Sequence, residues 1–520
     1  MGTHETYLIT DSDGRMRKHR CEWDPAHIER PERLDVILSA IKSSGLLKEC
    51  VELDPVMATD NDVMLVHSSQ YLSRLKEITD KTQDEQEDFC SQYEDIYLNS
   101  HTLEAAYLSV GSSIQATETV LKGSSESRNA FALVRPPGHH AYDDQGCGFC
   151  IFNNVAICAK WARKKGLSRV LIVDWDVHAG QGTQYCIEDD PGIKLVSIHR
   201  YQSGKFWPNL PESAIQTKYK NTINVPLNDT GYGDAEYFAF MNFLVRPIID
   251  AWKPELVLVS CGFDAALGDP EGEMEVSPAG YGHLTGLLSS LDIPLCLLLE
   301  GGYFLESIAQ DAVHSLRALI ERRPSPFPLA ETSLKPSFLE SLFSTIYFQR
   351  NEFQLLDEIY SVLELFKTIN KELKDEYQGV RQLKLPHQTR GLYPPRVHST
   401  EDHYRARLKK ICEAYENHLF PKPILDIQLK SHGMIFKTSD EDDFQIAVSS
   451  RPVAVFIFFL CLPMLSFEFD VQINSNNWYC VKLEEYLQAY HFTDDSLVKN
   501  SDVGLKKLFE HFPSLQIIFS

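Results

Sequence analysis

The chain has 520 residues, of which 43% are hydrophobic and 24% charged, an ordinary globular composition that suffices for one large domain and a smaller one. Its formal net charge of −23 disfavours direct binding to nucleic acid, whereas an acidic surface attracts cationic substrates or basic protein tails. The twelve cysteines have no regular spacing and no signal-like segment opens the sequence, which argues against a disulfide scaffold and predicts an intracellular protein.

Helical patterns and short strands rich in β-branched residues alternate through the first 320 or so residues. In chain order, we expect a helix over 28–47, a helix over 153–166, strands over 170–178 and 193–200, a helix over 235–252, strands over 255–264 and 295–303, and a helix over 305–323. This alternation predicts an α/β fold with an open, mostly parallel sheet flanked by helices.

A Pro-rich stretch over 322–336 marks the first predicted boundary. We therefore expect a main domain over 1–325, a helical and polar linker region over 326–400, and a smaller C-terminal α/β region of unknown function over 401–520. The most apolar stretch, 452–467, contains Pro463 and is shorter than the ~20 apolar residues of a membrane span. A buried strand pair or a core helix is the preferred interpretation, so no membrane association is expected.

Polar residues stand at the ends of three predicted strands. Asp174, Asp176 and His178 close one strand, Asp264 closes another and Tyr303 a third. Ligands of open parallel sheets bind beyond the carboxyl ends of the strands. Since residues two apart in a strand share a face, Asp176 and His178 with Asp264 form a two-carboxylate, one-imidazole set that suits a catalytic zinc ion. Solvated strand ends are the alternative for any one of these residues alone.

Two adjacent histidines, His139 and His140, follow the rigid sequence Pro-Pro-Gly. Water that a metal activates needs a base as it attacks a carbonyl, and the leaving nitrogen then needs an acid. One imidazole can serve both purposes while the second carries positive charge, and each needs an orienting partner. Asp174 and Gln181 are the predicted partners, and a structural pair of loop histidines is the alternative.

Further candidates surround this chemistry. Tyr303 follows two glycines, of which Gly301 lets the backbone approach a ligand, and its hydroxyl can donate to a developing oxyanion. Phe149 and Trp207 are candidate walls of an aromatic channel to the site. For each aromatic residue, plain packing in the core or at the rim is the alternative.

With these residues in place, the chain resembles the zinc-dependent histone deacetylases, in the class IIb group of tubulin-type and polyamine-type enzymes. The resemblance runs from about residue 6 to 322 and rests on seven stretches in family order: IERPERL, LVRPPGHHA, GFCIFNNVAI, DWDVHAGQGTQ, GKFWP, VSCGFDAALGDPEG and LEGGY. It implies the arginase-like open α/β fold and hydrolysis of N-acetyl amides, with acetylated protein tails or acetylated polyamines such as acetylspermidine as substrates. It also implies corepressor complexes as partners and a location in the cytoplasm, the nucleus or both.

Carried over residue by residue, the resemblance assigns the zinc ligands, the catalytic groups and a structural K⁺. The implied zinc ligands are Asp176, His178 and Asp264. His140 matches the general base and acid, His139 its electrostatic partner and Tyr303 the transition-state tyrosine, while Arg33 lies beneath the pocket. The K⁺ is implied near Asp174, Asp176, His178 and Ser197.

Three departures from the family pattern concern the surroundings of the metal and the entrance. Ala179 follows His178 where many relatives carry a second histidine, and Gln181 stands where relatives often carry Asp or Asn. The stretch WDPAH over 23–27 lacks the Cys and Glu of the turn that narrows the entrance in polyamine-type enzymes. Glu271, however, matches their gatekeeper glutamate, so we place it with Phe149, Trp207 and Gly301 among the substrate contacts. A solvated loop glutamate is the alternative.

Two other functions are considered. A two-manganese ureohydrolase needs further carboxylates, but Ala266 stands two residues after Asp264 and Gly180 two after His178, which favours a single metal. A catalytically inactive scaffold would act through its C-terminal region, which we interpret as a shortened, degenerate deacetylase-like segment. The complete set of chemical residues favours an enzyme.

Overall fold

The computed structural model describes residues 5–122, 129–324, 334–353, 356 and 400–416, and the backbone of 426–430, 433–437 and 443–447. The chain divides into two compact units. The main unit comprises residues 1–233, 252–325 and 388–413, and the minor unit comprises 234–251, 326–387 and 414–520.

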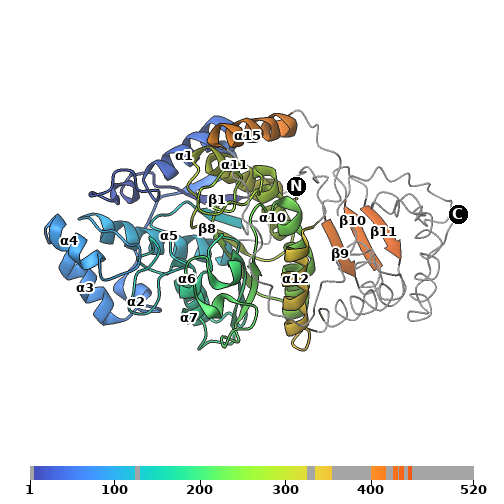
Figure 1. The fold of residues 1–520 in the computed structure, drawn as a ribbon, viewed down its shortest axis with the longest axis horizontal. Helices are drawn as coiled ribbons and strands as arrows, with labels where there is room; N and C mark the ends of the chain where they lie inside the picture. Colours follow the sequence, from blue (N-terminus) through green and yellow to red (C-terminus); the bar gives the residue numbers. More distant parts are fainter. Residues whose placement is uncertain are drawn as a thin grey trace. The chain divides into compact units, whose positions relative to one another are not determined.

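An eight-stranded sheet, with every neighbouring pair parallel, forms the centre of the main unit (Figure 1). The strand order is β2-β1-β3-β8-β7-β4-β5-β6. Five adjacent strands, β3, β8, β7, β4 and β5, are buried along their whole length, as expected of a parallel sheet covered on both faces. Their bounds are β1 (Thr6–Ile9), β2 (Cys50–Leu53), β3 (Asn129–Ala132), β4 (Val170–Asp174), β5 (Ile193–Arg200), β6 (Thr222–Leu227), β7 (Leu256–Cys261) and β8 (Leu295–Leu299).

Helices cover both faces of this sheet (Figure 1). Helices α5 and α6 pack on each other and on the central strands, whereas α1, α10 and α11 pack together on the other side. Local sequence sets their ends: Gly45 ends α1 in the left-handed conformation, and the Ser277 hydroxyl caps α10 at the N–H of Gly280. The α-helices of the main unit are α1 (Glu32–Ser44), α2 (Asp60–Val63), α3 (Ser69–Thr79), α4 (Gln83–Cys90), α5 (Thr102–Lys122), α6 (Asn154–Lys164), α7 (Gln181–Cys186), α10 (Pro278–Ser289), α11 (Leu305–Glu321) and α15 (Glu401–Glu416).

The predicted open parallel sheet is confirmed, but three strands end earlier than predicted. Strand β4 ends at Asp174, β7 at Cys261 and β8 at Leu299, so the polar residues after them lie in loops. Just beyond these strand ends, side-chain carboxylates accept several of the backbone N–H groups that a longer strand would use for pairing. The N–H of Val177 donates to Oδ1 of Asp264 at 2.7 Å, and that of Gly301 donates to Oδ2 of Asp176 at 2.9 Å.

The minor unit contains the helix predicted over 235–252, but in three parts. These are α8 (Asp234–Phe240), a π-helical turn (Met241–Val245) and α9 (Arg246–Trp252). Pro247 follows the π-helical turn and has no N–H for the regular helical bond. The other described elements of this unit are α12 (Pro336–Gln349) and an antiparallel sheet of β9 (Asp426–Lys430), β10 (Gly433–Lys437) and β11 (Asp443–Ala447).

Helix α15 follows the predicted linker, and its residues up to 413 belong to the main unit. Arg405 pairs with Glu306 at 2.7 Å and Arg407 with Glu275 at 3.0 Å, and Leu408 is buried. The domain limits at 325 and 400 stay predictions. None of the helices in the described ranges has the length and apolar character of a membrane span, and the stretch 452–467 lies outside those ranges.

A fully buried ion network lies beside the carboxyl ends of β1, β3 and β8. Glu29 accepts from Arg33 at 3.0 Å and, through both oxygens, from Arg135 at 2.9 and 2.8 Å. Arg33 in turn donates to the carbonyls of Gly302 at 2.6 Å and Glu300 at 2.5 Å. Although burial raises the pKa of Glu29, the charge of Arg135 holds it well below the usual range. Two buried guanidinium groups therefore share one carboxylate as their ion-pair partner.

We predict that Glu29→Gln destabilises the protein by about 3–5 kcal/mol, because it leaves two buried guanidinium groups without their counter-charge. Denaturant unfolding of the whole chain measures the change. The matched control is Glu321→Gln, which breaks a solvent-exposed pair with Arg323 and should cost less than about 1 kcal/mol. Equal losses in the two variants would contradict the role of the network.

Candidate metal and catalytic site

The strand order explains how residues far apart in the chain come together. Strands β3, β8, β7 and β4 are neighbours in the sheet, and each is followed by part of the candidate site. His139 and His140 follow β3, Tyr303 follows β8 and Asp264 follows β7, while β4 leads into the segment of Asp176 and His178. Their carboxyl ends share one edge because all four strands are parallel.

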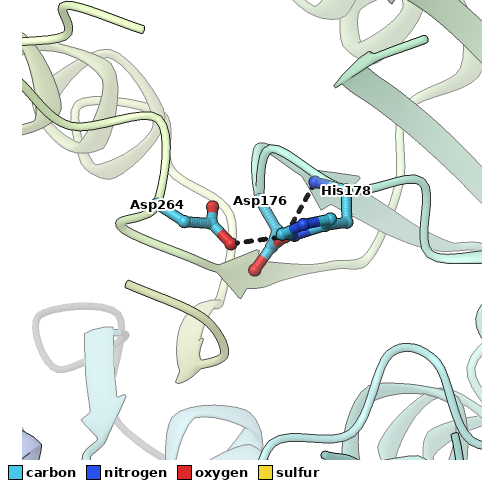
Figure 2. A group of neighbouring side chains, drawn as sticks. All are labelled: Asp176, His178 and Asp264. Atoms are coloured by element: carbon cyan, nitrogen blue, oxygen red, sulfur yellow. Dashed lines mark hydrogen bonds and ion pairs between the residues drawn. The ribbon is translucent and has the colours of Figure 1, made fainter. Parts of the chain in front are cut away.

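Asp176, His178 and Asp264 form a buried cluster that could hold a metal ion. One ligand atom of each residue lies within 4.8 Å of the others. Figure 2 shows both carboxylates directed at the imidazole, whose Nδ1 is 3.2 Å from Oδ1 of Asp176 and 3.2 Å from Oδ2 of Asp264. Nδ1 is therefore the atom of His178 that faces the carboxylates.

The donor set fits a zinc ion. Two carboxylates and one imidazole, with room for further ligands, are typical of catalytic rather than structural zinc sites. Burial and the charge of Asp176 raise the pKa of Asp264 to about 8, so a cation between the carboxylates would relieve their repulsion. Although burial lowers the pKa of His178, its hydrogen bonds to Asp176 and Asp264 raise it to about 10. The site thus favours positive charge.

The two adjacent histidines lie against this cluster with different partners. Nδ1 of His139 is 3.0 Å from Oδ2 of Asp174, and Nδ1 of His140 is 2.7 Å from Oε1 of Gln181. Despite burial, the charges of Asp176 and Asp174 raise the pKa of His139 well above its usual value. Burial and the charge of His139 lower the pKa of His140 well below it. A charged and a neutral imidazole therefore stand side by side.

Aromatic rings surround the histidines. The ring of Trp207 lies 4.5 Å from that of His140, and the ring of Phe206 stacks on His178 at 5.3 Å. Phe149 lies edge-on to Tyr303 at 5.9 Å. Phe206 was not singled out in the sequence, although it precedes Trp207 directly.

Tyr303 is partly exposed and lies above Arg33, whose guanidinium carbon is 5.1 Å from the centre of the phenol ring. Gly301 lies against the metal cluster: a Cβ atom there would come within 2.3 Å of Asp264 Oδ2 and 2.7 Å of Asp176 Oδ2. The backbone of Gly301 therefore lies beside the cluster. That it contacts the substrate stays a prediction.

Glu271 lies on a loop between β7 and α10. Its backbone N–H donates to Oδ1 of Asp269 at 3.0 Å and its carbonyl accepts from Arg200 at 3.0 Å. Its carboxylate is partly exposed and makes no hydrogen bond or ion pair within the described part of the chain. The backbone of Glu271 is thus held on both sides, while its carboxylate interacts with the charge of Arg200 without forming an ion pair.

Three buried polar residues of the site were not identified from the sequence. Glu300 accepts from the N–H groups of Gly138 and His139, at 2.6 and 3.2 Å, and so fixes the turn of the histidine pair. Asp269 and Arg200 hold the loop of Glu271. Glu300 lies in the stretch LEGGY and Asp269 in the stretch VSCGFDAALGDPEG, while Arg200 ends the predicted strand over 193–200. Their position in these segments was the sequence feature that could have identified them.

Comparison with known proteins gives a consistent result. The family model described as "Histone deacetylase domain" matches residues 27–319. The protein named "Polyamine deacetylase HDAC10" of Danio rerio is 42% identical over 322 residues, which cover 60% of this chain and 47% of that protein. Its namesake of Homo sapiens is 41% identical over 350 residues, covering 65% of this chain and 51% of that protein. The chain thus matches about half the length of these relatives.

A plant relative and a solved structure extend this similarity. "Histone deacetylase 18" of Arabidopsis thaliana is 37% identical over 320 residues, covering 59% of this chain and 47% of that protein. The solved structure "Crystal Structure of HDA15 HD domain" is 30% identical with a TM-score of 0.61, covering 72% of this chain and the whole of that one.

We predict that Asp264→Ala lowers zinc occupancy, because it removes one of the two anionic ligands. Metal analysis of the purified protein gives the readout, independently of activity. The control is Asp190→Ala, which removes a carboxylate paired with Arg163 outside the cluster and should leave zinc content unchanged. Full zinc retention in Asp264→Ala would rule out this ligand set.

Proposed function

Because the chain belongs to the histone deacetylase family, we propose that its site hydrolyses the amide bond of N-acetylated amines. One observation carries the proposal: four adjacent strand ends bring the histidine pair, the candidate metal ligands and a tyrosine to one edge of the sheet. The relatives named as polyamine and histone deacetylases support the same reaction class.

Asp176, His178 and Asp264 would hold the metal. When bound there, zinc would supply Lewis-acid polarisation of the acetyl carbonyl and would make a water molecule more acidic. Asp176 and Asp264 each have one oxygen near His178. The second oxygen of Asp176 accepts the N–H of Gly301 and that of Asp264 accepts the N–H of Val177, so both carboxylates are already oriented. A structural K⁺ near Asp174 and Ser197, which lie opposite each other on β4 and β5, stays part of the proposal.

His140 acts as the proton carrier in this proposal. Its imidazole is the neutral member of the pair and can accept a proton from the attacking water, then return it to the leaving nitrogen. Gln181 fixes the orientation of its ring, and the positive charge of His139, paired with Asp174, stabilises negative charge that develops nearby. The different environments of the two imidazoles support these different roles.

The hydroxyl of Tyr303 donates a hydrogen bond to the oxyanion that develops from the acetyl carbonyl. A neutral phenol is required for this donation, and burial raises the pKa of Tyr303 well above its usual value. Phe149, Phe206 and Trp207 form the apolar surroundings that exclude water from the reacting atoms.

The substrate class depends on Glu271. In an acetylated polyamine, an alkyl chain separates the acetylated nitrogen from a protonated amine, and this amine gains a charge-assisted hydrogen bond from a carboxylate. The neutral backbone of an acetyl-lysine residue does not. The carboxylate of Glu271, unpaired among the described residues, supports acetylated polyamines as preferred substrates. Since the stretch 23–27 lacks the narrowing Cys-Glu turn, acetylated protein tails are expected as second substrates. Corepressor complexes and a cytoplasmic or nuclear location belong to the same proposal.

An inactive scaffold acting through the C-terminal region is the second candidate. The complete metal cluster and the oriented histidine pair argue against it, since a scaffold needs neither. Turnover of an acetylated amine by the zinc-loaded whole chain distinguishes the two, and a zinc-loaded protein without turnover would favour the scaffold.

We predict that His140→Ala lowers kcat by about 10²–10⁴-fold, because it removes the proton carrier. Tyr303→Phe should lower kcat by about 10²–10³-fold through loss of one oxyanion donor. Both variants should keep their zinc, so metal analysis accompanies the kinetics. A wild-type rate in either variant would overturn the role given to that residue.

We also predict that Glu271→Leu lowers kcat/KM for acetylspermidine relative to an acetyl-lysine peptide by about ten- to a hundredfold, the value of one shielded charge-assisted bond of about 1.5–3 kcal/mol. Wild-type protein should turn over both substrates with a moderate polyamine preference. The control is Glu273→Gln, a neighbouring charge already paired with Arg200 at 3.5 Å, which should leave the ratio unchanged. An unchanged ratio in Glu271→Leu would favour a general protein-lysine deacetylase.

A further inference from the structure

Asp269 joins two loops that the proposed function uses separately. It is buried, at 3% exposure, and its two carboxylate oxygens serve different segments. Oδ1 accepts from the N–H groups of Glu271 at 3.0 Å and Gly272 at 3.4 Å. Oδ2 accepts from those of Tyr303 at 2.6 Å and Phe304 at 3.1 Å. One side chain therefore holds the backbone of both the entrance glutamate and the tyrosine.

The two segments have no strand pairing with each other that could replace this carboxylate. They follow β7 and β8, which pair only up to Cys261 and Leu299. Beyond these residues, the N–H of Phe263 donates to the carbonyl of Gly301 at 3.0 Å and the Ser307 hydroxyl donates to the carbonyl of Leu267 at 2.6 Å, but neither bond involves Glu271 or Tyr303. The four N–H groups held by Asp269 would be left without this acceptor if it were removed.

A second anchor makes the position of Glu271 depend on this arrangement. Arg200 donates to the carbonyls of Glu271 at 3.0 Å and Gly272 at 3.3 Å, and its guanidinium lies over the ring of Phe206, which stacks on His178. Asp269 holds the N–H groups of the same two residues. The loop is thus fixed from the metal cluster on one side and from the tyrosine loop on the other.

We infer that Asp269 is a positioning residue that fixes the backbone of Tyr303 and ties the Glu271 loop to it, so that the substrate's cationic nitrogen and its acetyl carbonyl are located by one rigid unit. This inference rests on the proposed function for the roles of Glu271 and Tyr303. The tie itself is a matter of hydrogen bonds and can be tested without turnover.

The test uses Asp269→Asn in the whole chain. Asparagine keeps the shape but turns one oxygen into a donor, so at least one pair of N–H groups loses its acceptor and the tie is broken. Backbone hydrogen exchange over 265–276 and 299–306 should become faster in at least one of the two segments. The matched control is Ser307→Ala, because the Ser307 hydroxyl also links the two segments. In this variant, hydrogen exchange at Glu271 and Tyr303 should be unchanged. Unaltered exchange at both segments in Asp269→Asn would overturn the inference.

Kinetics test the consequence. We expect Asp269→Asn to lower kcat by about ten- to a hundredfold, as for a reacting group displaced by roughly 1 Å, with zinc content retained. In a Tyr303→Phe background the same change should have little further effect, because the hydroxyl that it positions is already gone. An equal loss in both backgrounds, or no loss at all, would overturn the positioning role.

The tie to Glu271 has its own readout. Asp269→Asn should shift the ratio of acetylspermidine to acetyl-lysine turnover towards acetyl-lysine, and should not shift it further in a Glu271→Leu background. A ratio unchanged by Asp269→Asn, in a wild type that does prefer the polyamine, would overturn the tie. If wild type shows no such preference, the substrate proposal fails. Hydrogen exchange, and the comparison of Asp269→Asn in the wild-type and Tyr303→Phe backgrounds, then still decide the inference. Should Asp269→Asn not fold, Asp269→Glu keeps the acceptors but displaces them, and the same directions are expected.

Discussion

The buried carboxylate of Glu29 lies between the guanidinium groups of Arg33 and Arg135, and the edge of the sheet that carries the site is organised around it. Two buried cations without a counter-charge would be too costly for a folded protein. Their remaining N–H groups donate to backbone carbonyls: Arg33 binds Glu300 and Gly302, and Arg135 binds Met16 and His19. The loop that carries Tyr303 is therefore anchored by this ion network.

Carboxylates repeat this arrangement at the metal cluster. Asp176, Asp264, Asp269 and Glu300 each accept backbone N–H groups from a neighbouring loop. Beyond the strands few backbone–backbone bonds join these loops, and the side chains add to them. For Asp176 and Asp264, support and the candidate metal cluster share one residue, because a carboxylate has two oxygens and can offer one to a loop while the other faces the cluster.

Charge is distributed unevenly over this frame. His139 is stabilised as a cation by Asp174 and Asp176, which in turn helps to keep His140 neutral. Glu271 is different, since its partly exposed carboxylate makes no ion pair among the described residues, although its charge interacts with that of Arg200. If His140 carries the proton and the carboxylate of Glu271 faces the substrate, as proposed, the site suits a substrate with an amide at one end and an ammonium group at the other.

The sequence by itself determined the fold class and the chemical groups. Apolar runs of strand length and the polar residues directly after them predicted a parallel sheet with a site at its carboxyl edge, and the residue types in those stretches predicted the metal chemistry. Only the tertiary structure decided where the strands end and which ends are neighbours, because the order β3-β8-β7-β4 brings together segments that are distant in the sequence, such as β3, which ends at Ala132, and β8, which begins at Leu295. The supporting roles of Glu29, Glu300, Arg200 and Asp269 also needed the folded chain. A buried carboxylate looks the same in the sequence as an exposed one, and the backbone groups that it holds become its partners only when distant loops meet.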